Sequence, residues 1–260
     1  MGRVMAIVNQ KGGVGKSTTA VNLGAYLAAL NHPTLLVDID PQGNASSGVG
    51  VEKGRVKRCI YDVLVNDVPI KDLILDTAVK GLAVVPATIQ LAGAEIELVS
   101  MMSREIRLKR ALEGVREGYR YIIIDCPPSL GLLTLNALTA CDSVIVPIQC
   151  EYYALEGLSQ LLSTLELVRK HLNPGLHLEG VLLTMYDPRT NLSQQVIEEV
   201  KNFFKGKVFK NIIPRNVKLS EAPSHGMPII LYDDRSKGAE AYRNLAHEMI
   251  DLTSGVGVAG

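Results

Sequence analysis

The sequence has no tryptophan, three phenylalanines and an aromatic content of only 5%. An interior with so few rings must be filled by aliphatic side chains, and hydrophobic residues still make up 47% of the 260 residues. Interiors of Val, Ile, Leu and Ala are typical of parallel sheets covered by helices on both faces. A hydrophobic fraction this high also excludes an extensively disordered chain.

Cysteine is scarce as well, with four residues at Cys59, Cys126, Cys141 and Cys150. None of them forms a C-x-x-C pair, and no histidine stands at metal-ligand spacing from any of them. This spacing argues against a disulfide framework or a zinc site, so we expect buried, reduced thiols in a cytoplasmic protein.

Long apolar runs and excess charge are also missing. No uncharged apolar run reaches the roughly 18 residues that a membrane-spanning helix requires, and MGRVMAIVNQ turns polar too soon for a secretory signal. The net charge is zero, which argues against a globally basic nucleic-acid binder but leaves room for a local patch. The stretch 201–218 has no acidic residue and six basic ones: Lys201, Lys205, Lys207, Lys210, Arg215 and Lys218. Such a stretch is either a solvated helix face followed by a loop or a local DNA-binding patch.

Apolar runs of strand length alternate along the chain with segments of helical periodicity. The predicted strands are 4–8, 34–39, 82–85, 121–124, 143–148, 178–183 and 208–213, and the predicted helices are 17–30, 104–116, 130–140, 155–171, 192–204 and 238–252. This alternation predicts a single-domain α/β fold with a mostly parallel twisted sheet flanked by helices on both faces. Together with the glycine-rich loop described next, the expected fold class is that of a P-loop NTPase. We expect one domain over residues 1–252 and a short flexible tail of small residues at 253–260.

The segment QKGGVGKST follows the first apolar run and precedes the first helical stretch. Gly15, Lys16 and Ser17 fit the end of the general phosphate-loop pattern, but Gln10 stands where that pattern has its first glycine. Lys11 and two consecutive glycines follow instead. The strict pattern therefore fails at one position, although its strand–loop–helix context is right.

The chemistry of phosphate binding survives this departure. Three glycines remove side chains, so backbone N–H groups can close around phosphate oxygens at the positive end of the following helix. We expect Lys16 to reach the β- and γ-phosphates of ATP and the Ser17 hydroxyl to ligate Mg²⁺. The predicted nucleotide-binding loop comprises Lys11, Gly12, Gly13, Val14, Gly15, Lys16, Ser17 and Thr18.

Acidic residues stand at the ends of two predicted strands. Asp125 ends YIIID, where a carboxylate can hold magnesium through water, and Asp38 and Asp40 end LLVDID. Because the carboxyl ends of parallel strands share one edge of the sheet, we expect these side chains to meet the phosphate loop there.

With KGGVGKS, LLVDIDPQGN and YIIIDCPPS in view, the chain resembles the ParA/Soj branch of the deviant-Walker ATPases, which partition chromosomes and plasmids. The resemblance continues through PATIQLAGAEIEL, SLGLLTLNAL, CEYYALEGLSQL, LLTMYDPRTNLSQQV and IPRNVKLSEAPSHGMPI. It therefore covers nearly the whole chain, in long motifs that keep their order.

The resemblance implies a role for each motif residue. Lys11 would cross a nucleotide-sandwich homodimer to the partner's phosphates, which gives a reason for the departure at Gln10. Gly12 would be small because the partner's backbone passes close. Asp40 would orient the attacking water and Asp125 would hold the magnesium shell, with Asp38 as a structural or supporting group.

The same resemblance places Pro214 and Asn216 near the adenine, and Arg215 either there or on DNA. It implies that the ATP-bound dimer binds nonspecific double-stranded DNA through Arg189, Arg215 and Lys218. Lys218 stands where Arg is familiar in relatives, so bidentate phosphate pairing is lost. Two weak patches side by side gain by effective concentration, so that nucleotide would control DNA binding through dimerisation.

The implied partner is a ParB/Spo0J-type protein that stimulates hydrolysis, and the implied location is the cytoplasm, on the nucleoid.

Three alternative functions are open. A membrane-associated positioning ATPase of the MinD kind would need a basic amphipathic helix, which DLTSGVGVAG does not supply. An iron–sulfur relative would need cluster-bridging cysteines, and Cys126 and Cys150 do not match. A nucleotide-binding scaffold without turnover would have no use for Asp40.

Overall fold

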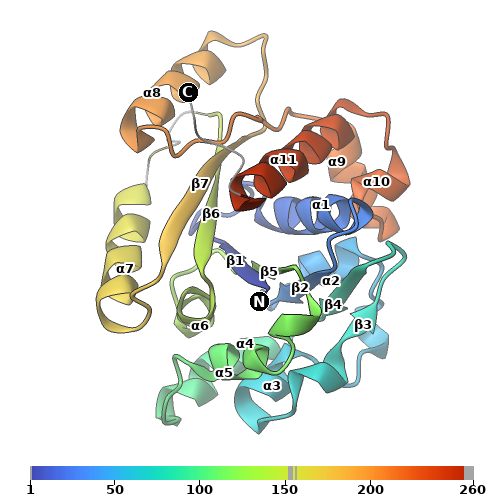
Figure 1. Ribbon diagram of the computed structural model, residues 1–260, viewed down its shortest axis with the longest axis vertical. Helices are drawn as coiled ribbons and strands as arrows, with labels where there is room; N and C mark the ends of the chain where they lie inside the picture. The colour runs from blue at the N-terminus through green and yellow to red at the C-terminus, as the bar shows by residue number, and fades with distance from the viewer. Residues whose placement is uncertain (1, 152–154, 156, 255–260) are drawn as a thin grey trace.

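The computed structural model describes residues 2–151, 155 and 157–254, and within them a seven-stranded sheet forms the centre of the molecule (Figure 1). The strands lie in the order β3-β4-β2-β5-β1-β6-β7. Six of them are mutually parallel, and the edge strand β3 is antiparallel to β4. The strands are β1 (Arg3–Ile7), β2 (Thr34–Asp38), β3 (Leu75–Asp76), β4 (Leu82–Val85), β5 (Tyr121–Asp125), β6 (Ser143–Gln149) and β7 (His177–Thr184).

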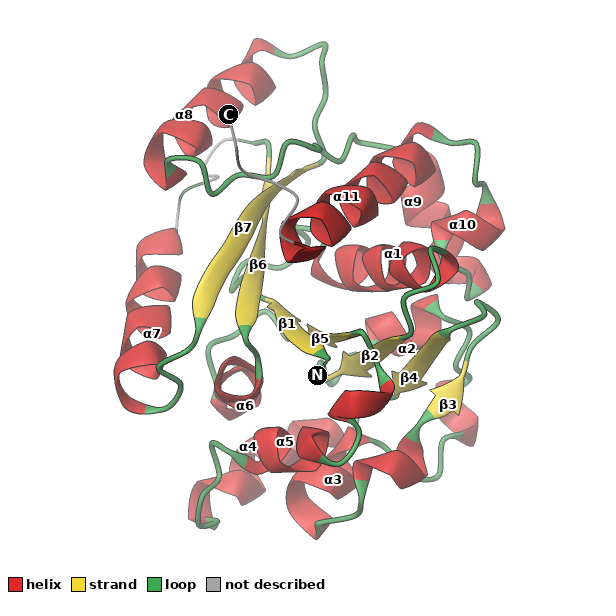
Figure 2. Cartoon of the chain, viewed as in Figure 1, coloured by secondary structure: helices red, strands yellow, loops and turns green. Residues whose placement is uncertain are grey.

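Helices cover both faces of this sheet (Figure 2). The α-helices are α1 (Lys16–Ala29), α2 (Asn44–Gly48), α3 (Ile60–Asn66), α4 (Leu91–Glu97), α5 (Arg107–Glu113), α6 (Leu132–Ala140), α7 (Leu158–His171), α8 (Asn191–Phe204), α9 (Val217–Glu221), α10 (Ile229–Tyr232) and α11 (Lys237–Ser254). Short 3₁₀ turns occur at η1 (Lys53–Arg55), η2 (Ile70–Leu73), η3 (Leu98–Ser100), η4 (Arg116–Gly118) and η5 (Ala222–His225). None of the helices in the described ranges is both long enough and apolar enough to cross a bilayer.

Alternate residues of each central strand supply the two hydrophobic cores. In β1, Val4 and Ala6 face the core under α3 to α8, whereas Met5 and Ile7 face the core under α1, α10 and α11. This is the two-residue period of a strand, and because both faces are covered the strand reads as a continuous apolar run.

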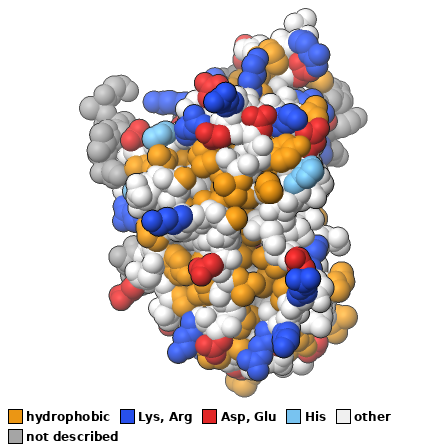
Figure 3. All heavy atoms as spheres, turned by 90° about the vertical axis from the view of Figure 1, so that its right-hand side faces the viewer, with side chains coloured by type: hydrophobic (Ala, Val, Ile, Leu, Met, Phe, Trp, Pro, Cys, Tyr) orange, Lys and Arg blue, Asp and Glu red, His pale blue; other side chains and the backbone are white. Residues whose placement is uncertain are grey.

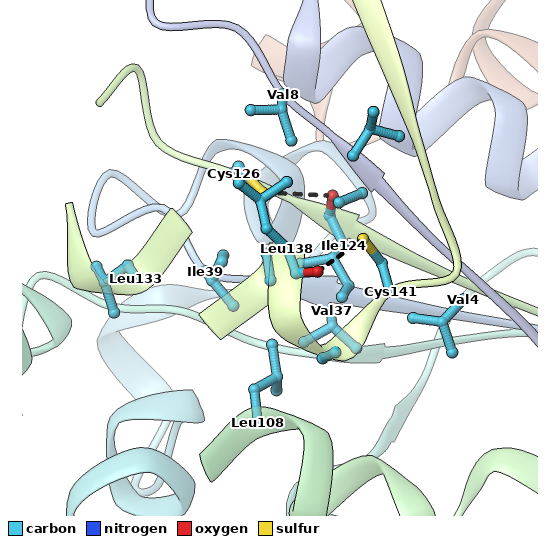
Figure 4. Close-up of a cluster of buried hydrophobic side chains, with 14 of the residues drawn as sticks. Val4, Val8, Val37, Ile39, Leu108, Ile124, Cys126, Leu133, Leu138 and Cys141 are labelled. Atoms are coloured by element: carbon cyan, nitrogen blue, oxygen red, sulfur yellow. Dashed lines mark hydrogen bonds between the residues drawn. The ribbon is translucent and has the colours of Figure 1, made fainter. Parts of the chain in front are cut away.

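All four cysteines are buried and unpaired, as the spacing predicted. Cys126 and Cys141 lie among aliphatic side chains of β1, β2, β5 and α6 (Figure 4). Burial raises the pKa of both thiols well above the usual range. These cysteines therefore act as small hydrophobic groups of the core.

The predicted fold class is confirmed, and the six longer strands lie within a residue of their predicted positions. The strand predicted at 208–213 is wrong. Within that segment only Val208 forms an isolated bridge, with Val181, and a second bridge joins the next residue, Pro214, to Tyr186. Between them Glu248 of α11 accepts the backbone N–H groups of Lys210 and Asn211, so these groups are not available to a strand.

Other differences concern short or terminal elements. Helices α2, α3, α4, α9 and α10 and the two-residue strand β3 were not predicted. The helix predicted at 155–171 begins at Leu158, with part of its predicted start outside the described residues. Helix α11 continues to Ser254, two residues past the predicted domain end, and 255–260 lie outside the described residues.

Candidate phosphate-binding site

The segment between β1 and α1 is a tight loop that depends on glycine. Gly13 and Gly15 have φ angles of 73° and 90°, a region that other residues rarely adopt. The loop is fastened at its base, because Asn9 donates to the carbonyl oxygen of Pro147 at 2.7 Å and accepts from the N–H of Lys11 at 2.9 Å. It thus presents its N–H groups at the N-terminus of α1, where helices bind anions.

The two lysines of the loop occupy different positions. Lys16 is only 7% exposed, and its Nζ donates to the carbonyl oxygen of Lys11 at 3.0 Å. Burial lowers the pKa of Lys16, and the charges of Asp125 and Asp40 oppose that shift. Lys11 itself has an exposed side chain. The site therefore contains one desolvated cation directed inward and one cation directed to solvent.

Asp125 ends β5 at the base of the site and is fully buried. Neither carboxylate oxygen accepts a hydrogen bond within the described chain. Burial, and next the charge of Asp38, raise its pKa well above the usual range, against the influence of the nearby Ser17 hydroxyl. An unpartnered buried carboxylate beside a hydroxyl fits the oxygen ligands that Mg²⁺ prefers, so Asp125 and Ser17 fit a magnesium site.

Asp38 is equally buried, but its carboxylate is fully engaged. It accepts bonds from the N–H and the hydroxyl of Ser46, at 2.8 and 2.7 Å, and from the N–H of Asp40 at 3.1 Å. Burial raises its pKa to about 6 against these hydrogen bonds. Asp38 therefore fastens the loop after β2 to α2.

Asp40 lies in that loop and turns toward the cleft. Its Oδ1 accepts the N–H of Gln42 at 2.9 Å. Lys53 supports the loop from behind by donating to the carbonyl oxygen of Gln42 at 2.7 Å. Gly43, with φ of 62°, has no room for a Cβ, which would lie 2.8 Å from the carbonyl oxygen of Ala87. The backbone that carries Asp40 is thus held on several sides.

These groups line a cleft of about 530 Å³. From the predicted loop it includes Gly12, Gly13, Gly15, Lys16, Ser17 and Thr18, and from the predicted carboxylates it includes Asp40. Residues that were given no role in the sequence analysis complete the wall, among them Asn22, Gln42, Pro128, Met185, Pro223 and Met227. Only the fold brings these last residues together, since they come from five separate segments.

The residues predicted near the adenine do not line this cleft. Asn216 caps α9 by accepting the N–H of Lys218 at 2.9 Å. Pro214 forms a bridge with Tyr186, the residue that follows Met185 in the cleft wall. Met185 lines the cleft next to this bridge. Its φ of 53° lies in the left-handed region, which residues other than glycine rarely adopt.

A second cleft is larger, about 1050 Å³, and lies between β3 and α10. Apolar side chains gather along the middle of this face, between charged side chains of both signs (Figure 3). Its lining includes no residue of the phosphate loop and shares only Met227 with the first cleft. Size alone would select this second cleft, but the cation, the buried carboxylate and the glycine loop are all at the first.

Of the predicted DNA-contacting residues, Arg189 follows β7, Arg215 precedes α9 and Lys218 lies within α9. Arg215 donates its N–H to the carbonyl oxygen of Tyr186 at 2.9 Å, next to Asp187. All three cations have carboxylate partners: Arg189 pairs with Asp187 at 2.6 Å, Arg215 with Glu151 at 2.5 Å and Lys218 with Glu221 at 3.0 Å. The Arg189 guanidinium lowers the pKa of Asp187 to about 2. These exposed pairs contribute little to stability, so another anion can displace them.

A parallel sheet, a glycine loop at its carboxyl edge, a buried lysine and converging carboxylates define a P-loop nucleotide-binding protein. Comparison with known proteins makes this more specific. A family model described as an AAA domain matches residues 2–178.

The chain is 69% identical over 249 residues to the sporulation initiation inhibitor protein Soj of Bacillus subtilis, covering 96% of this chain and 98% of that protein. It is 59% identical over 250 residues to the chromosome partitioning protein ParA of Myxococcus xanthus, covering 96% and 88%. The chain therefore belongs to the ParA/Soj family of chromosome-partitioning ATPases.

Among solved structures, the chain is similar to cobyrinic acid a,c-diamide synthase from Mycobacterium smegmatis with bound ATP analogue and magnesium. The TM-score is 0.87 at 40% identity, over 98% of this chain and 97% of that one. The same protein with ADP and magnesium also has a TM-score of 0.87, at 41% identity and the same coverage. Both similarities therefore cover nearly the whole chain.

Proposed function

We propose that this chain binds ATP with Mg²⁺ in the 530 Å³ cleft and hydrolyses it, and that ATP binding drives pairing with a second copy that holds DNA. The observation that carries the proposal is the unpartnered carboxylate of Asp125, buried beside Ser17 and Lys16 at the glycine loop. A buried carboxylate without a partner is costly to stability. A cation that it helps to hold would offset that cost.

Each cleft residue has a chemical task in this proposal. Lys16 exchanges the carbonyl oxygen of Lys11 for phosphate oxygens, because a charge-assisted bond to an anion is the stronger one. Ser17 and Asp125 hold magnesium, which when bound neutralises charge on the phosphates. Asp40, held in place through Gln42, orients the attacking water. Adenine recognition is assigned to Pro214 and Asn216, as the resemblance implies; neither lines the cleft, so the base would extend past Met185 toward the bridge between Tyr186 and Pro214.

Lys11 and Gly12 support an active site that a second copy completes. The side chain of Lys11 is exposed and does not line the cleft of its own chain. A Cβ at Gly12 would meet no atom of the described chain within 4 Å, so the chain itself leaves that space open. A facing protomer would fill it and receive Lys11 at its phosphates, where a cation in trans stabilises transition-state charge.

The DNA-binding surface is assigned to Arg189, Arg215 and Lys218, which would exchange their carboxylate partners for phosphates of nonspecific duplex DNA. One protomer supplies too few contacts, and an ATP-bound dimer doubles them at high effective concentration. A ParB/Spo0J-type partner would accelerate hydrolysis and so release DNA. The protein would then work in the cytoplasm on the nucleoid, in chromosome segregation.

The test is ATP turnover by the purified chain, measured alone, with duplex DNA, with a basic ParB-type N-terminal peptide, and with both. Low basal turnover that DNA and peptide together raise supports the proposal. If turnover is high without additions and does not change with DNA or peptide, the proposed control of DNA binding by ATP is contradicted. If the chain does not bind ATP with magnesium, the proposed nucleotide site is contradicted.

A further inference from the structure

Helix α4 carries a carboxylate on the side that faces the core. Leu91, Ala94 and Leu98 are fully buried at helical spacing, whereas Ile96 and Glu97 are exposed. Glu95 stands four residues after Leu91 and therefore lies toward the buried side of the helix. Its Oε1 is buried and accepts no hydrogen bond from the described chain.

The Glu95 carboxylate contacts the residue at which α6 begins. A Cβ at Gly131, the N-cap of α6, would lie 2.2 Å from Glu95 Oε1 and 3.2 Å from its Cδ. Gly131 has φ of −74°, so its backbone conformation does not require glycine. A side chain at this position would therefore meet the carboxylate, and Glu95 would have to move to admit it.

A nearby anion would stabilise the N-terminus of α6, because its own N-cap residue has no side chain. No side-chain cap satisfies its first N–H groups, and such groups form the positive end of the helix dipole. Glu95 places a negative charge there from a neighbouring helix. The charge lies in a partly buried setting, where its interaction with the dipole is screened little.

The start of α6 is tied in turn to the cleft. Thr134, in the first turn, donates from its hydroxyl to the carbonyl oxygen of Ser129 at 2.7 Å. The preceding residue, Pro128, lines the cleft, and the same loop begins directly after Asp125. A displaced α6 N-terminus would therefore move one wall of the cleft and loosen the strand end that carries the buried carboxylate.

We propose that Glu95 is a positioning residue, whose contact with Gly131 holds the loop 126–131 and thereby sets the magnesium-binding geometry of Asp125. This inference rests on the proposed ATP-binding function, and it concerns a residue that contacts neither nucleotide nor metal. The Gly131 position makes it testable from both sides of the contact.

The first experiment compares E95Q with E97Q, a matched change two residues away at an exposed carboxylate that accepts only from the Tyr61 hydroxyl. In E95Q, amide hydrogen exchange of residues 129–132, which carry the first backbone N–H groups after two prolines, should rise roughly two- to fivefold in nucleotide-free protein, as expected for a lost charge at a helix end. The Mg²⁺ concentration for half-maximal ATP turnover should rise by a similar factor. E97Q should leave both quantities unchanged.

The second experiment is a double-mutant cycle of E95A, G131A and E95A/G131A. A methyl group at Gly131 pushes the carboxylate away, so each single variant should show the same rise in exchange and in the Mg²⁺ requirement. The double variant should add nothing further. Additive effects, or an E95Q indistinguishable from E97Q, would overturn the inference. Should the wild-type chain fail to bind ATP, the proposed function fails, and the exchange data on nucleotide-free protein still decide whether Glu95 holds the loop.

Discussion

Asp38 and Asp125 are register partners on the parallel strands β2 and β5, yet only Asp38 has its carboxylate hydrogen bonded. Both are fully buried, and burial raises the pKa of both. One carboxylate thus fastens the loop that carries Asp40. The other is held without a partner at the base of the cleft, which is a cost to the nucleotide-free fold.

Asp125→Asn should therefore stabilise the nucleotide-free protein while it removes the response to magnesium. Neutralising an unsatisfied buried carboxylate relieves its desolvation penalty, and we expect a gain of about 1–3 kcal/mol in the free energy of unfolding at pH 8. The measurement is urea denaturation with EDTA and then with Mg²⁺ and ATP. Asp76→Asn, at an exposed carboxylate of β3, is the control. A destabilised variant that still gains from magnesium would contradict the assignment.

The pH dependence of that gain follows from the direction of the pKa shifts. A carboxyl group whose pKa is raised in the folded state keeps its proton to a higher pH there than in the unfolded state. Its contribution to stability is therefore present below pH about 4, the unfolded pKa, and is lost as the pH rises through the folded pKa. The pKa of Asp38 is about 6 in the folded chain, and that of Asp125 is raised in the same direction.

The difference in unfolding free energy between Asp125→Asn and the wild type should therefore be small near pH 4 and grow as the pH rises, with EDTA present throughout. Asp38 is present in both proteins, but its carboxylate interacts with that of Asp125, so the difference also includes the change that removing the Asp125 charge makes in the titration of Asp38. A difference that is constant with pH would show that Asp125 is charged over the whole range.

The core of the site was readable from the sequence because it rests on local chemistry. Glycines before Lys16 and carboxylates after apolar strands are fixed by backbone geometry, which the sequence pattern reports directly. Met185 and Pro223 carry no such local signal, since only tertiary packing brings them to the cleft. The strand predicted at 208–213 is wrong for the same reason, since a tertiary contact decides its structure. Glu248 of α11, distant in the sequence, accepts the backbone N–H groups of Lys210 and Asn211.

Lys16→Ala should abolish nucleotide binding. The buried ammonium now donates to the carbonyl oxygen of Lys11 and would face phosphates in the complex, and truncating one side of a buried charge pair costs enough to weaken binding roughly 30-fold or more. Calorimetric titration with ATP and Mg²⁺ measures this. Lys109→Ala, at an exposed lysine of α5, should bind normally. Ordinary affinity in Lys16→Ala would remove the loop from the site.

Asp40→Ala should separate binding from turnover. The carboxylate lines the cleft but accepts only a bond within its own loop, from Gln42, so its loss should spare ATP affinity. Turnover should fall about 10²- to 10⁴-fold, the range for removal of a group that positions or deprotonates the attacking water. On size exclusion with ATP the variant should accumulate as a dimer. A monomer under those conditions would refute the catalytic role.

The predicted DNA-binding surface can be tested by one change that should weaken DNA binding and another that should strengthen it. The first change is at Arg189 and Lys218. The double change Arg189→Glu and Lys218→Glu should abolish ATP-dependent binding of duplex DNA, because it reverses two phosphate contacts per protomer. ATP-dependent dimerisation should persist, since exposed pairs of this kind add little to stability. The matched control, Lys109→Glu with Lys170→Glu, reverses two exposed lysines on α5 and α7 and should bind DNA with nearly wild-type affinity.

The opposite change acts on the competing carboxylate. Asp187 accepts two bonds from the Arg189 guanidinium, at 2.8 and 2.6 Å, so a phosphate must displace it. Asp187→Asn should therefore tighten DNA binding a few-fold at low salt, and should steepen the fall of affinity with salt concentration if Arg189 gains a phosphate contact. Both variants are measured by filter binding at several salt concentrations with ATP present. If charge reversal at Arg189 and Lys218 leaves affinity intact while Asp187→Asn is silent, DNA is bound on another face.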